Sequence, residues 1–171
     1  ASVTKLITTA TALEILGKDF TFKTYIEYDG ELTNGVLNGN LYIRGGGDPT
    51  LGSYKMGDPR FMLSWAKIIK NAGIKEIRGA VIADVSLYDQ EGVSPKWLWE
   101  DIANYYAPAI FALSIFDNTC RVTLRSGAEG SIPEIISHKP FIEDMNLHNH
   151  LVVKNIKSDS AYFYGSPLSN E

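Results

Sequence analysis

Three tight-turn dipeptides between residues 29 and 39 restrict the possible folds of this chain more than any other feature. They are Asp29-Gly30, Asn34-Gly35 and Asn38-Gly39. Such pairs favour two-residue hairpin turns, because Asn, Asp and Gly tolerate the positive backbone dihedral φ that these turns need. Residues 20–29 alternate between apolar and polar side chains before the turns, and residues 40–44 follow them. The pattern predicts a meander of short antiparallel strands.

The first sixteen residues form a different pattern. Residues 2–16 carry apolar or small side chains on nearly every helical face, and their only charges are Lys5 and Glu14. Gly17 then provides a left-handed helix end. A helix that is apolar nearly all round is normally buried on all sides, so we expect this helix to be buried. A lysine on a buried helix favours a catalytic role for Lys5. The alternative is that the helix is a plain core helix and that Lys5 only reaches the surface.

A second helix is expected in the middle of the chain. Asp58-Pro59 starts it, an apolar stripe runs to about residue 72, and Gly73 closes it. Residues 74–84 then read as a strand. A strand, a helix and a strand in this order indicate an α+β layer.

The second half of the chain is less regular. Residues 86–113 are rich in aromatic side chains and are punctuated by prolines. A long loop of this kind is unusual unless it lines something. Further elements are expected in four places: strands at 113–124 and 132–137, a helical turn at 141–147, and a terminal hairpin of 151–156 with 161–164.

Composition excludes several classes of function. The 171 residues have a net charge of −4 and no basic run, so nucleic-acid binding has no electrostatic support. Cys120 is the only cysteine, so no disulfide can form within the chain, and it is expected to fill a small core space. His148 and His150 have no third ligand at a suitable spacing, so no metal or cofactor is expected. The sequence contains no run of eighteen apolar residues, which is the length needed to span a membrane.

Two loops each allow two interpretations. The glycine-rich loop at 45–51 lacks the spacing and the lysine of a phosphate-binding loop, which favours a structural role. The segment WLWED at 97–101 is either a loop packed down by tryptophans or a functional loop with carboxylates. Tyr105 and Tyr106 could stack on a sugar or fill the core.

Ser2 and Lys5 form an S-x-x-K pair at the start of the first helix. Residues three apart on a helix share a face, so the hydroxyl and the amine can meet. A serine becomes a nucleophile when an adjacent base takes its proton, and a buried lysine can be that base. The alternative is a helix-capping serine beside a solvated lysine. The spacing alone is a weak signal.

Several segments resemble the D-alanyl-D-alanine carboxypeptidases of the serine peptidase S13 group, the class C low-molecular-mass penicillin-binding proteins. S-x-x-K is one of the motifs of serine β-lactamases and penicillin-binding proteins. The resemblance extends in order along the whole chain. The matching segments are ASVTKL at 1–6, LGKDFTFKT at 16–24, NGVLNGNL at 34–41, GGDPTL at 46–51, WLWED at 97–101 and YGSP at 164–167.

The resemblance implies an α+β fold made of two parts. Residues 1–22 would carry the nucleophile helix of a penicillin-binding-protein transpeptidase domain. Residues 23–171 would belong to an inserted α+β domain of short antiparallel strands and helices, incomplete at its C-terminus.

The resemblance also implies roles for three residues. Ser2 would be acylated by a D-Ala-D-Ala stem peptide of peptidoglycan, or by a penicillin, and Lys5 would take its proton. Asp101 would bind the free amino group of a diaminopimelate-like side chain. The implied location is the periplasm or cell envelope.

The sequence departs from the family pattern in one respect. It contains neither the S-x-N motif nor the K-T-G motif, since Lys23-Thr24 is followed by Tyr25. We therefore expect the chain to be a fragment that is inactive alone, and we expect its uncovered first helix either to pack against a neighbouring copy or to be poorly ordered. A different class of function is also possible: a non-catalytic module that binds peptidoglycan or a protein, with Ser2 as a cap.

Overall fold

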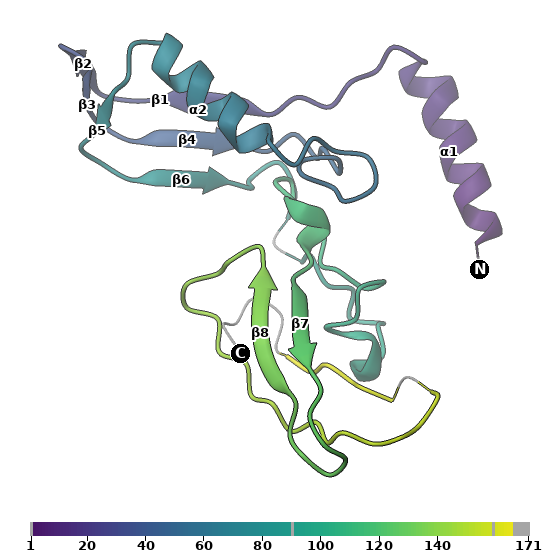
Figure 1. The fold of residues 1–171 in the computed structure, drawn as a ribbon. Helices are drawn as coiled ribbons and strands as arrows, with labels where there is room; N and C mark the ends of the chain where they lie inside the picture. The colour runs from purple at the N-terminus through teal and green to yellow at the C-terminus, as the bar shows by residue number, and fades with distance from the viewer. Residues whose placement is uncertain (1, 90, 159, 166–171) are drawn as a thin grey trace.

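The computed structural model describes residues 2–89, 91–158 and 160–165, and it shows a mixed α/β chain with small sheets (Figure 1). Its helices are α1 (Val3–Leu16), α2 (Phe61–Asn71) and the short 3-10 helices η1 (Trp99–Asp101) and η2 (Phe116–Asn118). Its strands are β1 (Tyr25–Tyr28), β2 (Glu31–Thr33), β3 (Val36–Asn38), β4 (Leu41–Arg44), β5 (Glu76–Ile77), β6 (Val81–Asp84), β7 (Arg121–Arg125) and β8 (Glu134–Lys139).

The predicted short strands are present, but their predicted pairing as a meander was wrong: β1 pairs with β4 and β2 with β3, so the four strands form one long bent ribbon, a hairpin with its turn between β2 and β3. β1, β4 and β6 form one sheet, while β2, β3 and β5 form another. The antiparallel pairs are β1–β4 and β2–β3, and the parallel pairs are β4–β6 and β3–β5. The hairpin between β2 and β3 turns at Asn34 and Gly35, whose φ angles are 53° and 86°. Both angles are positive, as the Asn-Gly pair predicts.

A row of glycines marks the line where the two sheets meet. A Cβ atom on Gly30 would collide with the backbone at Asn38, one on Gly39 with the backbone at Asp29, and one on Gly79 with that at Gly39. The three strands therefore cross this line in close contact because none of them carries a side chain there.

Side-chain hydrogen bonds stabilise the bend where the two sheets meet. The Asp29 carboxylate accepts hydrogen bonds from the backbone N–H of Asn40 at 2.6 Å and from the Tyr42 hydroxyl at 2.7 Å. The Asn40 side-chain oxygen accepts one from the backbone N–H of Ala80 at 3.0 Å. These bonds replace ladder bonds that the bend interrupts.

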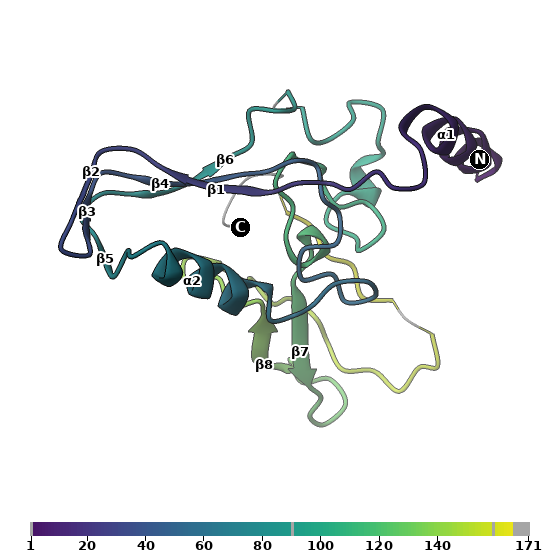
Figure 2. The same cartoon turned by 90° about the horizontal axis from the view of Figure 1, so that it is seen from above.

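The helix α2 connects the parallel strands and covers the ribbon (Figure 2). Parallel neighbours need such a crossover connection. Leu37, Leu41 and Ile74 are buried at the centre of this unit, and Ile69 of α2 packs against them. Part of the apolar stripe predicted for α2 therefore covers the core, while Ile68 remains exposed.

The glycine-rich loop joins this unit to the second half of the chain. The backbone N–H of Gly47 donates to the carbonyl of Ala112 at 2.7 Å, and the backbone N–H of Phe116 donates to the carbonyl of Leu51 at 2.9 Å. The rings of Phe61 and Phe116 meet edge to face at 5.5 Å. The loop has the structural role that its sequence favoured.

Several expected boundaries were wrong. The single strand expected at 74–84 is two strands, β5 and β6, because the bent ribbon interrupts it at Gly79. At 141–147 the structure has one short turn rather than a helix, with the backbone N–H of Met145 donating to the carbonyl of Ile142 at 3.3 Å. The expected hairpin of 151–156 with 161–164 is absent from the described residues. Instead the backbone N–H of Val153 donates to the carbonyl of Ser131 at 2.8 Å, so this segment pairs with the β7–β8 loop.

Parts of two expected features lie outside the described residues. The turn at 158–160 includes Asp159, and the YGSP segment includes Ser166 and Pro167.

The first helix has the predicted bounds, but its predicted burial was wrong. None of its residues is buried, and Figure 1 shows α1 standing apart beyond an extended segment at 17–24. Leu6 is 71% exposed and Ile15 is 74% exposed. The described residues provide no surface that covers this helix.

Candidate functional site

Ser2 and Lys5 lie on the first turn of α1. The backbone N–H of Lys5 donates to the carbonyl of Ser2 at 3.1 Å, and Ser2 has helical backbone angles of −61° and −17°. The Ser2 side chain makes no capping hydrogen bond. Its hydroxyl is therefore not committed to the helix end, which disfavours the capping interpretation.

The same spacing occurs a second time, on α2. Ser64 and Lys67 also form an S-x-x-K pair, and both are exposed. Because two helices of one chain carry the pattern, its spacing cannot identify a nucleophile. The choice between the two serines must come from what surrounds each pair.

Asp101 ends the short helix η1, within the aromatic loop. The backbone N–H of Asp101 donates to the carbonyl of Leu98 at 3.0 Å, and the side-chain amide of Asn104 donates to the carbonyl of Glu100 at 2.7 Å. Ala103 has a φ of 72°, which turns the chain sharply after η1. These local bonds hold Asp101 on a defined turn.

The Tyr106 hydroxyl donates a hydrogen bond to the Asp101 carboxylate at 3.1 Å. This bond raises the pKa of Tyr106, because loss of its proton would remove the bond and place a second negative charge beside the carboxylate. Sequence reasoning missed this contact. Residues five apart have no periodic relation in a loop, so no signal in the sequence could have found it.

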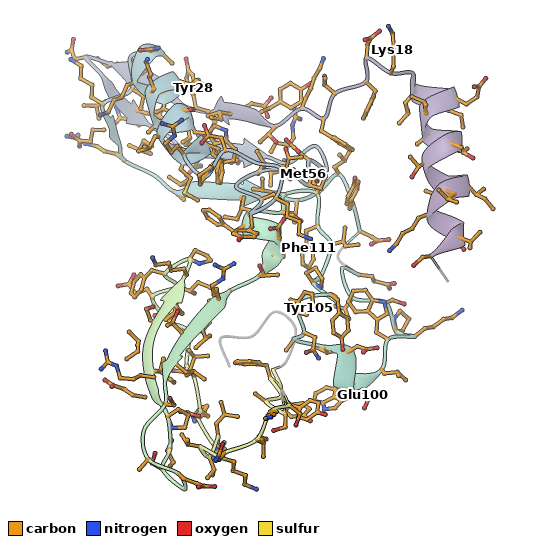
Figure 3. The ribbon with its side chains drawn as sticks, turned by 45° about the vertical axis from the view of Figure 1, so that its right-hand side comes forward. Lys18, Tyr28, Met56, Glu100, Tyr105 and Phe111 are labelled. Carbon is orange, nitrogen blue, oxygen red and sulfur yellow. The ribbon has the colours of Figure 1, made fainter. Side chains whose placement is uncertain are left out.

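Tyr105 and Tyr106 are exposed rather than part of the core. Tyr105 is 82% exposed and Tyr106 is 60% exposed, and their rings meet edge to face at 5.3 Å. Figure 3 shows Tyr105 and Glu100 on the same outer loop, below Phe111. The aromatic loop therefore presents aromatic and acidic groups at one surface.

The described residues do not bring the three predicted site residues together. Within the described residues neither Ser2 nor Lys5 has a hydrogen bond or ion pair to Asp101, and the N-terminal end of α1 lies apart from η1 in both ribbon views (Figures 1 and 2). Lys5 is exposed on the isolated helix. The residues predicted as nucleophile and base thus lie on one turn, and the described residues build no site around them.

No group of three or more histidine, cysteine or acidic side chains among the described residues could hold a metal ion. No helix within these residues is long and apolar enough to cross a membrane.

Comparison with known proteins identifies the family. The sequence profile of the D-Ala-D-Ala carboxypeptidase 3 (S13) family matches residues 1–162, which include the S-x-x-K pair of α1. The chain belongs to this family. The match covers both S-x-x-K pairs, so by itself it does not distinguish Ser2 from Ser64.

Two curated relatives agree with this assignment. The D-alanyl-D-alanine carboxypeptidase DacB of Haemophilus influenzae is 32% identical over 120 residues, which are 70% of this chain and 24% of the relative. The D-alanyl-D-alanine carboxypeptidase of an Actinomadura species is 30% identical over 141 residues, 79% of this chain and 25% of the relative. The chain spans about a quarter of the length of each.

Solved structures show the same similarity in three dimensions. The crystal structure of penicillin binding protein 4 (dacB) from Haemophilus influenzae matches with a TM-score of 0.67 at 32% identity, covering 79% of this chain and 29% of that one. A complex of that protein with a novel β-lactam matches with a TM-score of 0.55 at 30% identity, covering 79% of this chain and 25% of that one.

Proposed function

We propose that the full-length protein containing these residues is a serine D-Ala-D-Ala carboxypeptidase or endopeptidase of the bacterial periplasm or cell envelope. The observation that carries the proposal is the family match over residues 1–162, which begins on the S-x-x-K pair of α1. The uncommitted Ser2 hydroxyl on the first turn supports it. In this proposal residues 1–22 belong to the transpeptidase domain and 23–171 to an inserted domain.

The proposed reaction is acyl transfer to Ser2. Lys5, in its neutral form, takes the hydroxyl proton while the Ser2 oxygen attacks the carbonyl carbon of the penultimate D-Ala. The bond to the terminal D-Ala breaks, and that D-Ala leaves with a proton on its nitrogen. Water then hydrolyses the acyl-serine ester and releases the peptide. A lysine serves as a base only when other groups shield it from water, so this step requires cover over α1.

Asp101 is proposed to recognise the substrate. A carboxylate on a defined turn suits the free ammonium group of a stem-peptide side chain, because charge-assisted hydrogen bonds of this kind are strong. The Tyr106 hydroxyl holds that carboxylate from one side. The remaining lone pairs of the carboxylate are available to a ligand.

The isolated chain is proposed to be inactive, because groups that stabilise the developing oxyanion and bind the substrate carboxylate are absent from its sequence. Labelled penicillin followed by mass spectrometry tests both statements. The full-length protein should give a stoichiometric adduct on Ser2, and the isolated chain should give none. Full-length protein that ignores β-lactams would favour the alternative of a non-catalytic peptidoglycan- or protein-binding module.

A further inference from the structure

β7 and β8 run side by side as a hairpin (Figure 1), and their register sets two positively charged side chains opposite each other. Arg121 is the cross-strand partner of Lys139, and both residues are exposed. Cross-strand partners have Cβ atoms about 4.5–5.5 Å apart, and like charges in such a pair destabilise a sheet. At the other end of the ladder, Arg125 and Glu134 have opposite charges and form an ion pair at 3.0 Å. Strand pairing therefore explains Arg125 but not the Arg121–Lys139 pair.

No acidic side chain of the described residues neutralises the Arg121–Lys139 pair. Four of the five arginines of the chain form an ion pair with an aspartate or glutamate, at 2.8 to 3.4 Å: Arg44, Arg60, Arg78 and Arg125. In the described part of the chain, Arg121 and Lys139 form none. The acidic residue nearest to Arg121 in the sequence is Asp117, and its carboxylate accepts a hydrogen bond from the backbone N–H of Tyr54 at 3.0 Å. Two positive charges thus face each other unmatched.

The Arg121 guanidinium is held in place by an aromatic ring. It lies over the ring of Tyr54, 4.8 Å from the ring centre. The hydrogen bond to Asp117 fixes the backbone of Tyr54 beside the start of β7. Such a contact uses the flat face of the guanidinium and leaves its N–H edges free, and those edges bind oxyanions in a bidentate manner. Lys55 follows Tyr54 directly, is exposed, and likewise has no ion pair within the described residues.

The next cross-strand pair adds two hydroxyl groups. Thr123 is the partner of Ser137. Because side chains alternate along a strand, this pair shares its face of the hairpin with Arg121 and Lys139, about 7 Å further along. Neither hydroxyl has a hydrogen-bond partner among the residues that the structure describes. This face of the hairpin therefore combines two unmatched cations with two uncommitted hydroxyl donors.

We propose that this face of the β7–β8 hairpin binds a phosphate monoester. A phosphate monoester carries a charge of about −1.5 to −2 at neutral pH, which matches the two cations, whereas a carboxylate carries half as much. The guanidinium edge of Arg121 takes two phosphate oxygens, the Lys139 ammonium takes the third, and the hydroxyls of Thr123 and Ser137 are available as further donors. The chain as a whole has a net charge of −4, so the attraction is local to this face. The proposal is independent of the proposed peptidase activity.

Two titrations test the proposal and distinguish a soluble phosphate monoester from a lipid headgroup. Glycerol 3-phosphate, added at constant ionic strength to a nitrogen-15-labelled chain, should shift the backbone amide resonances of β7 and β8 saturably. Acetate should bind about threefold more weakly, because it carries half the charge. Vesicles of phosphatidylcholine with phosphatidic acid form the second arm, with plain phosphatidylcholine vesicles as the blank. Saturable binding in either arm supports the proposal and names the source. Absence of binding in both arms would overturn it.

Matched variants assign the binding to this pair of cations. Arg121→Gln and Lys139→Gln should each weaken binding about threefold, and the double variant about tenfold. Arg78→Gln removes the same charge from an exposed, ion-paired arginine beside β5 and should leave the affinity unchanged. Lys139→Gln also removes the repulsion across the strands, so its urea midpoint without ligand should equal or exceed that of the wild type. Unchanged affinity in the double variant, or an equal loss in Arg78→Gln, would overturn the proposal.

Discussion

The two α-helices of this chain have opposite relations to the rest of the molecule. α2 has one face on the core around Leu37 and Ile74, where Ile69 packs, and its other faces are exposed. α1 is apolar or small on nearly every face, yet none of its residues is buried. A helix that is apolar all round is suited to a buried position, whereas an amphipathic helix is suited to the surface of a domain. Figure 1 shows both outcomes in one chain.

The same comparison applies to the chemistry, because each helix carries an S-x-x-K pair. Ser64 and Lys67 stand on the solvent side of a helix whose other face is already occupied by the core. Ser2 and Lys5 stand on a helix with every face still open. Only the second arrangement leaves room for an enclosed site to be built around the serine.

The largest expected effect is on acylation of the full-length protein. Ser2→Ala should abolish the covalent penicillin adduct and reduce peptidase activity at least about a thousandfold, because the acyl acceptor is removed. Lys5→Ala should act in the same direction. Mass spectrometry and release of D-Ala measure the two effects.

Ser64→Ala and Lys67→Ala are the matched controls from α2. Both should retain adduct formation and turnover, since their side chains are exposed on the solvent face. Loss of the adduct in Ser64→Ala with retention in Ser2→Ala would reverse the assignment of the nucleophile.

The next largest effect is on the stability of the isolated chain. Leu37→Ala should cost about 2–5 kcal/mol of unfolding free energy, because Leu37 is 0% exposed and its removal leaves a cavity in the core. Leu6→Ala, at a side chain that is 71% exposed, should change it by less than about 0.5 kcal/mol. Urea titration followed by circular dichroism gives both values. The titration uses a chain dilute enough to be monomeric, so a large loss from Leu6→Ala would show that α1 is covered within the monomer.

An effect of intermediate size is expected on self-association, which should depend on α1 and not on α2. Because α1 exposes apolar surface on all sides, we expect the isolated chain to sediment above its monomer mass of 18.9 kDa as its concentration rises. Leu6→Lys should return it to the monomer. Leu63→Lys on α2 is the matched control, since Leu63 is 70% exposed and Leu6 is 71% exposed. A wild-type monomer at all concentrations would contradict this expectation.

The smallest expected effect concerns the bend of the ribbon that α2 covers. Hydrogen bonds from the backbone of Asn40 and from the Tyr42 hydroxyl lower the pKa of Asp29. A lowered folded-state pKa contributes stability above the unfolded value, and that stability is lost as pH falls through the folded value. The wild-type chain should therefore lose some stability as pH falls below the ordinary aspartate value of 3.8.

Asp29→Asn should remove this part of the acid dependence, as measured by urea midpoints at neutral and acid pH. Asp144→Asn is the control, since its carboxylate accepts no hydrogen bond among the described residues. An unchanged acid dependence in Asp29→Asn would show that the bend does not depend on the ionised carboxylate.

The sequence predicted most local elements of the first half because their signals are short-range. Asn34-Gly35 requires a turn whatever surrounds it, Gly17 ends a helix by its own backbone freedom, and the stripe of α2 selects one face. The family motif placed Ser2 and Lys5 on a helical first turn, and the structure agrees. These results depend on neighbours within a few residues.

Only the tertiary structure decided how distant residues meet. The bend at Gly30, Gly39 and Gly79 joins three strands that lie far apart in the chain, so no local pattern could place it. The contact between Tyr106 and Asp101 depends on an irregular loop without periodicity. The burial expected for α1 from its composition was wrong in this chain. Composition indicates which contacts a helix favours, but only the fold determines which residues lie around it.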